Sequence, residues 1–275
     1  MKELNAMTPD IENEHSNIYF IEDDKVIKRF KKLDDQVKRT ILKKYIYVKD
    51  HNIQIDYMSL PIDILETEKG FCAYIEKAIP GSKEKGLMHY SDYLNEHLMT
   101  ITLEDIIDYI LKVCDVVQNC HEYNIINPDM CSGHNVSFDP TTRSIYFTDF
   151  QGMQVGEITT PNINSFIAQD PILNDPKYYA NNLYSKNIDL YTLAVRFFYY
   201  ATKINIPRCI PGGYDIEYVL KLTNFEKTLF AECMRRLWDK NKDNLDIREA
   251  LLELKDNYEI SGFKQGETRR LIEKK

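Results

Sequence analysis

Three residues in the middle of the chain, Asp129, Asn135 and Asp149, could do chemistry together. Carboxylate and amide oxygens are ligands that Mg²⁺ accepts in proteins, and a further carboxylate can orient a hydroxyl group by accepting its proton. Asn135 and Asp149 are 14 positions apart, which leaves room for one hairpin between them. This order of groups therefore suits Mg²⁺ held on a polyphosphate and a hydroxyl positioned for attack.

The elements that must position these residues are a hairpin and a long helix before it. Residues 136–147 have the pattern of two strands with an Asp-Pro dipeptide at the turn. Residues 102–123 carry apolar side chains at helical spacing, and Thr102 followed by Asp105 is typical of a helix start. We therefore expect the helix to lead into the polar segment and the hairpin to bring its two ends together.

The first 80 residues are predicted to form a small sheet with one helix. Residues 17–30 alternate apolar and polar side chains around an acidic turn, as in a two-stranded hairpin. Residues 33–50 switch to helical spacing. Two further extended pieces and a joint follow, at residues 57–65, 70–78 and 80–81. The remainder is predicted to be mainly helical, with helices over residues 188–201, 225–238 and 247–256.

The helix predicted over residues 33–50 has two different faces. Its apolar face contains Leu33, Val37, Ile41, Tyr45 and Val48. Its opposite, basic face is expected to contain Lys38, Arg39, Lys43, Lys44 and Lys49. Such a run is most often a solvated helix face, and the alternative is a docking surface for an acidic protein partner.

Composition excludes some classes of function. The chain has 275 residues and a formal net charge of −8, which argues against general binding of nucleic acid or of a membrane surface. None of the six cysteines forms a C-x-x-C pair, so we expect free thiols in a reducing compartment. The first residues are polar and lack an apolar signal region, so a cytoplasmic location is expected.

Taken in order, four motifs resemble those of the eukaryotic-type protein kinase superfamily, in particular small divergent kinase-like proteins of bacteria. Lys28 ends a Val-Ile-Lys tripeptide similar to the family's Val-Ala-Ile-Lys. Asp129 ends Asn-Pro-Asp where the family has His-Arg-Asp, and Asp149 begins Asp-Phe-Gln-Gly, similar to Asp-Phe-Gly. Asp189 lies where the family begins its central helix. The resemblance extends from about residue 18 to about residue 256.

The resemblance implies an α+β, bilobal protein kinase-like fold, with a small β-rich N-lobe over residues 1–78 and a larger, mainly helical C-lobe over residues 79–275. It implies ATP and Mg²⁺ as cofactors and a hydroxyl-bearing protein or small molecule as acceptor. Asp129 would be catalytic, Asn135 and Asp149 would bind the metal, and Asp189 would accept backbone N–H bonds. The implied cofactor-binding residues are Lys28, Ser16, Asn17, Glu76 and Ala78.

Departures from the family pattern leave alternatives open. Residues 12–17 contain no glycine where the family has a Gly-rich loop. The helix predicted over residues 33–50 has no glutamate to pair with Lys28, and the acids nearby are Asp34, Asp35 and Asp50. Lys28 would then pair with Asp149, or the helix would be displaced.

The alternatives to an active kinase come from these departures. A pseudokinase, which binds a nucleotide or a partner without transferring phosphate, is favoured by the missing loop and the missing glutamate. A small-molecule kinase of the aminoglycoside or choline kinase type is favoured by Cys131, which stands two residues after Asp129 where protein Ser/Thr kinases have a lysine.

Overall fold

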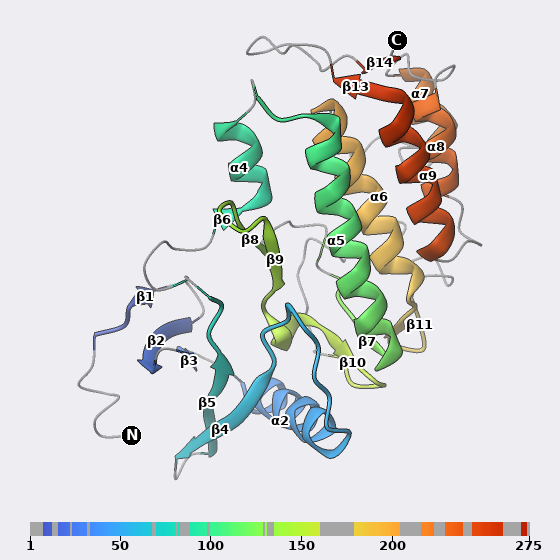
Figure 1. Cartoon of the computed structure of the whole chain (residues 1–275). Helices are drawn as coiled ribbons and strands as arrows, with labels where there is room; N and C mark the ends of the chain where they lie inside the picture. Colours follow the sequence, from blue (N-terminus) through green and yellow to red (C-terminus); the bar gives the residue numbers. More distant parts are fainter. Residues whose placement is uncertain are drawn as a thin grey trace.

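The computed structural model describes a small sheet-containing part and a larger helical part (Figure 1). The residues described are 8–12, 16–22, 24–31, 34–67, 70–80, 82, 88–97, 100–128, 130, 135–159, 179–203, 216–222, 229–238, 244–260 and 271–273. The sheet and one helix lie at one end of the molecule, and most helices lie at the other end.

The small lobe is built on a five-stranded antiparallel sheet with the order β1-β2-β3-β5-β4. The strands are β1 (Ile11–Glu12), β2 (Ser16–Glu22), β3 (Lys25–Phe30), β4 (Pro61–Thr67) and β5 (Gly70–Lys77). The hairpin predicted over residues 17–30 is confirmed by the pairing of β2 with β3. The piece predicted at residues 57–65 becomes a strand only at Pro61. Proline is tolerated at this first position of a strand, where its missing N–H is not needed for pairing.

Helix α2 (Asp35–Asp50) packs on one face of this sheet, with Ile41 against Tyr74 of β5. Asp34 is its N-cap and accepts a hydrogen bond from the Val37 backbone N–H at 2.8 Å. The predicted helix is thus confirmed over its described residues.

The predicted position of Lys44 on the exposed basic face of α2 is wrong. Lys44 is fully buried, since it lies on the same stripe as Ile41, Tyr45 and Val48, three residues after the first and four before the last. Its ammonium group donates hydrogen bonds to the backbone carbonyl oxygen of Met153 and, at 3.0 Å, to that of Gln151. Burial lowers the pKa of Lys44 from 10.5 to about 7. Lys44 therefore anchors α2 instead of joining a docking surface.

The large lobe is a group of helices packed around α5 (Leu103–Glu122), which contacts α6 (Asn187–Thr202) and α9 (Asn244–Asn257). The other described helices are α4 (Tyr90–Glu96), α7 (Ile216–Leu222), α8 (Leu229–Trp238) and the 3₁₀ turn η2 (Phe150–Gly152). The helices predicted from apolar spacing are confirmed over their described residues, because each buries its apolar stripe in one shared core.

Short strands support the segments between these helices. They are β6 (Met88–His89), β7 (Ile125–Ile126), β8 (Val136–Asp139), β9 (Ser144–Phe147), β10 (Gln154–Val155), β11 (Tyr179–Ala180), β12 (Leu183–Tyr184), β13 (Tyr258–Ile260) and β14 (Leu271–Glu273). The predicted hairpin over residues 136–147 is confirmed by the pairing of β8 with β9. Near the C-terminal end of the described residues, β14 pairs with β13.

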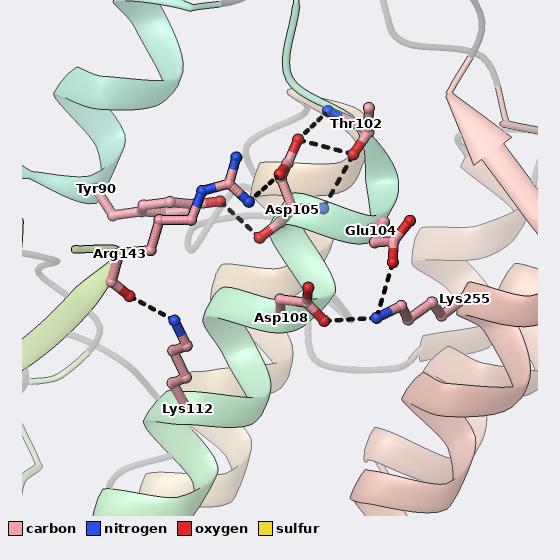
Figure 2. A network of polar contacts seen from close by, with 8 residues as sticks. All are labelled: Tyr90, Thr102, Glu104, Asp105, Asp108, Lys112, Arg143 and Lys255. Atoms are coloured by element: carbon pink, nitrogen blue, oxygen red, sulfur yellow. Dashed lines mark hydrogen bonds and ion pairs between the residues drawn. The ribbon is translucent and has the colours of Figure 1, made fainter. Parts of the chain in front are cut away.

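Figure 2 shows the polar network at the start of α5. Thr102 and Asp105 form the expected capping box, with the Thr102 backbone N–H donating to the Asp105 carboxylate at 3.0 Å. The Arg143 guanidinium, from the turn between β8 and β9, donates to the same carboxylate at 2.8 Å. Lys112 donates to the Arg143 carbonyl oxygen at 2.6 Å. The helix start is thereby fixed to the hairpin that carries the polar segment.

Backbone hydrogen bonds join the two lobes. The Phe147 N–H donates to the Tyr57 carbonyl oxygen at 2.7 Å, and the Ser59 N–H donates to the Phe147 carbonyl oxygen at 2.9 Å. The chain before β4 therefore runs beside β9, which explains why residues 57–60 do not extend the small-lobe sheet.

The expectation for the cysteines can be compared with the described residues. Cys72, Cys114, Cys120 and Cys233 are free thiols, as expected. Within the part of the chain that the structure describes, every helix is too short or too polar to cross a membrane.

Replacing Asp105 with alanine is expected to lower the free energy of unfolding by about 2 kcal/mol, because the helix loses its capping box and Arg143 loses its acceptor. Urea unfolding measures this change. Glu104→Ala is the matched control, since Glu104 is the adjacent exposed acid and pairs only with Lys255 at 3.1 Å among the described residues. Its expected cost is below about 1 kcal/mol. Equal costs for the two variants would contradict the role given to Asp105.

Lys44→Met is expected to change how stability depends on pH. Because the pKa of Lys44 is lowered to about 7, the unfolded chain binds more protons than the folded chain between pH 7 and 10.5. Wild-type stability therefore gains a contribution as pH rises through this window, and the variant lacks it. Urea unfolding at several pH values measures the difference, with exposed Lys43→Met as control. A difference between wild type and Lys44→Met that stays constant with pH would mean that Lys44 is solvated.

Candidate active site

The β8–β9 hairpin brings Asn135 and Asp149 to the same place. Its register pairs Val136 with Phe147, so the residues just outside the hairpin are neighbours. The Thr148 backbone N–H donates to the Asn135 carbonyl oxygen at 3.0 Å, which closes the open end of the hairpin. The 14-residue separation in sequence thus becomes adjacency in space.

Asp149 has a left-handed backbone, with φ of 67°, directly before the 3₁₀ turn η2. Aspartate tolerates this conformation better than most residues, although it costs energy. The buried side chain of Phe150, the next residue, holds the turn in the core. The strained residue is therefore kept in place by packing on its C-terminal side.

Lys28 approaches Asp149 from the small lobe. Strand β3 pairs with β5 so that Lys28 lies opposite Tyr74 and Val26 lies opposite Glu76. Side chains alternate between the faces of a strand, so these four residues share the face that looks toward α2 and the large lobe. The Lys28 ammonium forms an ion pair with the Asp149 carboxylate. The expectation that Lys28 pairs with Asp149 in the absence of a helix glutamate is thus confirmed.

The two acids at the start of α2 have other roles. Asp34 caps the helix, and Asp35 pairs with Lys38 at 3.1 Å on the surface. Neither replaces the missing glutamate.

Gln151 takes part in the same cluster of side chains. Its amide oxygen accepts hydrogen bonds from the Lys28 ammonium at 3.1 Å and from the Tyr74 hydroxyl at 2.6 Å. Its amide nitrogen donates to the Asp149 carboxylate. Sequence reasoning noted Gln151 only as a substitute for glycine, and no pattern in the sequence marked Tyr74 as its partner.

The cluster lies at the polar side of a cleft of about 400 Å³. Its described lining residues are Ile11, Ile18, Phe20, Val26, Lys28, Ser59, Glu76, Lys77, Ile79, Ser82, His89, Asn135, Ser137, Thr148 and Asp149. Apolar side chains of β1, β2 and β3 line the cleft, and most of its polar groups come from β3, β5 and the β8–β9 hairpin. A volume in this range suits a small-molecule ligand.

Of the predicted site residues, Lys28, Glu76, Asn135 and Asp149 are brought together along this cleft. Ser16, Asn17 and Ala78 are absent from its described lining. Ser16 and Asn17 lie in β2, opposite Phe30 and Arg29 of β3. The Ala78 backbone N–H donates to the Asp24 carbonyl oxygen at 2.7 Å. Ser59 was missed, since it precedes β4 and nothing in the sequence links it to β5.

Glu76 is a buried acid inside the cleft wall, with 6% of its surface exposed. Burial raises the pKa of Glu76 to about 7, although the nearby Lys28 charge and a hydrogen bond from Ser59 lower it in part. The Ser59 hydroxyl lies 3.1 Å from one carboxyl oxygen of Glu76. At neutral pH a substantial fraction of Glu76 is therefore uncharged, which reduces its repulsion of an anionic ligand.

Asp189 holds the backbone of the segment that leads to Asp129. Its carboxylate is buried in the first turn of α6 and accepts hydrogen bonds from the Asn127 backbone N–H at 3.1 and 3.2 Å. It also contacts the His121 ring nitrogen at 2.9 Å. The expectation that Asp189 accepts backbone N–H bonds from this segment is confirmed. Asp129, two residues after Asn127, lies outside the described residues.

No family model and no curated protein matches the chain. Among solved structures, the autoinhibited serine kinase domain of the giant muscle protein titin is similar, with a TM-score of 0.60 and 17% sequence identity. The match covers 90% of this chain and 77% of the titin chain. An identity this low supports the fold alone. The predicted fold class is thus confirmed: the chain has an α+β protein kinase-like fold, with a β-sheet part at the N-terminal end and a helical part at the C-terminal end.

Proposed function

We propose that the chain is an ATP- and Mg²⁺-dependent phosphotransferase of the protein kinase-like superfamily that acts on a hydroxyl group. One observation carries the proposal: Lys28, Asn135 and Asp149 come from three separate segments and line one cleft of about 400 Å³. A cation for phosphates and two oxygen ligands for Mg²⁺ are the groups that phosphoryl transfer requires. The kinase-like fold supports the proposal in general terms.

The donor set fits Mg²⁺ held jointly with a nucleotide. Asn135 and Asp149 offer an amide and a carboxylate oxygen, which are hard ligands suited to this ion. The described residues contain no group of three or more His, Cys, Asp or Glu side chains that could hold a metal by themselves. Phosphate oxygens would therefore have to complete the coordination, as is usual for Mg²⁺ in nucleotide sites. The bound ion would neutralise charge on the phosphates.

Each protein group then has a defined role. The Lys28 ammonium would bind phosphate oxygens of the nucleotide, and Asp149, now its ion-pair partner, would hold the metal. Asp129 accepts the proton of the acceptor hydroxyl, whose oxygen forms a bond to the terminal phosphorus as the bond from that phosphorus to the bridging oxygen breaks. Asp189 keeps the segment before Asp129 in place through the Asn127 backbone. The type of acceptor is proposed from the family resemblance alone, and that resemblance favours a Ser/Thr-type hydroxyl. Residues 160–178, which follow the Asp149 motif, lie outside the described residues.

A second candidate function is a nucleotide-binding module without phosphate transfer. The amide group of Gln151 donates to the same Asp149 carboxylate oxygen that pairs with Lys28. Both donors would compete with a metal for that oxygen, which favours a pseudokinase. The two candidates share the cleft and differ in turnover.

Wild-type protein is expected to bind Mg²⁺·ATP in calorimetry, and Asp149→Ala is expected to bind it about tenfold or more weakly, a loss of at least about 1.4 kcal/mol. Without Mg²⁺, wild-type affinity should fall in the same direction, because Asp149 then has no cation to share with the phosphates.

Asp139→Ala is the matched control, because Asp139 ends β8 on the same hairpin and accepts hydrogen bonds within its own turn, from the Thr141 backbone N–H at 2.8 Å and from the Thr142 hydroxyl. Its affinity should equal that of wild type. Absence of binding by wild-type protein at millimolar Mg²⁺·ATP would overturn the proposed function.

Asp129→Asn separates the two candidate functions. For an active enzyme, this variant should bind Mg²⁺·ATP like wild type but turn it over about 10²- to 10⁴-fold more slowly, because the general base is lost. A coupled assay of ADP release, with water or a test hydroxyl as acceptor, measures the rate. Wild-type turnover in Asp129→Asn would remove Asp129 from the mechanism. Binding without turnover in wild type would favour the pseudokinase.

A further inference from the structure

Two residues of one short segment, Asp149 and Gln151, hold the Lys28 ammonium in place. Its ammonium has two acceptors, the Asp149 carboxylate and the Gln151 amide oxygen at 3.1 Å. Among the described contacts of Lys28, none comes from an acid of α2. The acceptor that a helix carboxylate would supply thus comes from a neutral side chain two residues after Asp149.

The hydrogen-bond donors around Gln151 define which way its amide faces. The Lys28 ammonium can only donate, whereas the Tyr74 hydroxyl can donate or accept. The Gln151 amide oxygen therefore faces Lys28, and the Tyr74 hydroxyl donates to the same oxygen. Burial raises the pKa of Tyr74 well above its ordinary value, so the hydroxyl keeps its proton. The amide nitrogen is left to face Asp149, where it donates.

Lys44 holds the backbone of the same residue. Its ammonium lies 3.0 Å from the Gln151 carbonyl oxygen and also donates to the carbonyl oxygen of Met153. Helix α2 therefore holds the backbone of residues 151–153 through Lys44, and β5 holds the Gln151 side chain through Tyr74. Gln151 is restrained at both its backbone and its side chain.

We propose that Gln151 is a positioning residue that sets the Lys28 ammonium for the phosphates of the ligand, with Tyr74 and Lys44 holding Gln151 in turn. Helix α2 then acts on the cleft through Gln151, and no direct ion pair between the helix and Lys28 is needed. The reference to phosphates rests on the proposed function. The neutral amide orients Lys28 without cancelling its charge, so the full charge of the ammonium would be available to an anionic ligand once Asp149 leaves the ion pair.

The test measures Lys28 in nucleotide-free protein. The rate of Lys28 acetylation by an amine-reactive acetyl ester, followed by peptide mass spectrometry, is expected to rise about tenfold in Gln151→Ala, because the Lys28 side chain loses one of its two acceptors and reaches the reagent more easily. Gln151→Glu restores an acceptor for Lys28 and is expected to return the rate to the wild-type value or below it. Tyr74→Phe, which frees the Gln151 side chain, should give a smaller rise.

Gln154→Ala is the matched control. Gln154 is a buried glutamine in the same segment, and its amide makes two hydrogen bonds to the Tyr184 backbone, at 3.1 and 2.7 Å, away from Lys28. Its Lys28 acetylation rate should equal that of wild type. A wild-type rate in Gln151→Ala, or equal rises in Gln151→Ala and Gln154→Ala, would overturn the positioning role, since the first shows no effect on Lys28 and the second shows only a loosened segment.

A second measurement separates this inference from the proposed function. If wild-type protein binds Mg²⁺·ATP, Gln151→Ala should bind it about tenfold more weakly and Gln151→Glu should recover part of the loss. If Gln151→Ala binds it like wild type, the positioning role is overturned. If wild-type protein does not bind Mg²⁺·ATP, the proposed function fails, and the acetylation rates alone decide whether Gln151 positions Lys28.

Discussion

The ion pair between Lys28 and Asp149 is the interaction on which the geometry of the cleft depends. It joins β3 of the small lobe to the turn after β9 of the large lobe, so it sets the base of the cleft between them. The Lys28 side chain is 10% exposed and the Asp149 side chain is 38% exposed. A pair that is partly solvated costs less desolvation than a fully buried pair and gains less from its charges. Such a pair can separate when a charged ligand offers each partner a new one.

Two buried ionisable groups surround this pair, and their environments act in opposite directions. Burial raises the pKa of Glu76 to about 7 and lowers that of Lys44 to about 7. Each group is tolerated because it has partners, Ser59 for Glu76 and two carbonyl oxygens for Lys44. Removing these two groups from water costs free energy, and the burial of apolar side chains in a core that extends from α2 to α9 offsets it. Glu76 lines the cleft, and a perturbed group at a cleft is typical of functional sites.

The sequence predicted the elements well where one periodicity dominates. The hairpin of β2 and β3 and the helix α5 follow from alternating and helical apolar patterns, and the start of α5 follows from the pair Thr102 and Asp105. The side chain of Lys44 was mispredicted because a lysine on a buried stripe contradicts the usual rule that charge faces water. Ser16 and Asn17 were predicted at the cleft from their position in the chain. Asn17 lies on the opposite face of β2 from the cleft residues Ile18 and Phe20, whereas Ser16 shares their face but lies beyond the described lining, opposite Phe30.

The sequence by itself determined the order of the reactive groups and the elements that carry them, because composition, periodicity and turn residues act locally. Which groups meet depends on the packing of the folded chain, including whether Lys28 pairs with Asp149, one of two alternatives that the sequence left open. Lys28 and Asp149 are 121 residues apart in the chain, and Tyr74 and Gln151 are 77 apart. Their contacts depend on strand register and on the packing of α2 against the turn after β9. Hydrogen bonds across such separations leave no pattern in a single sequence, since any polar residue at the right place in the fold could make them.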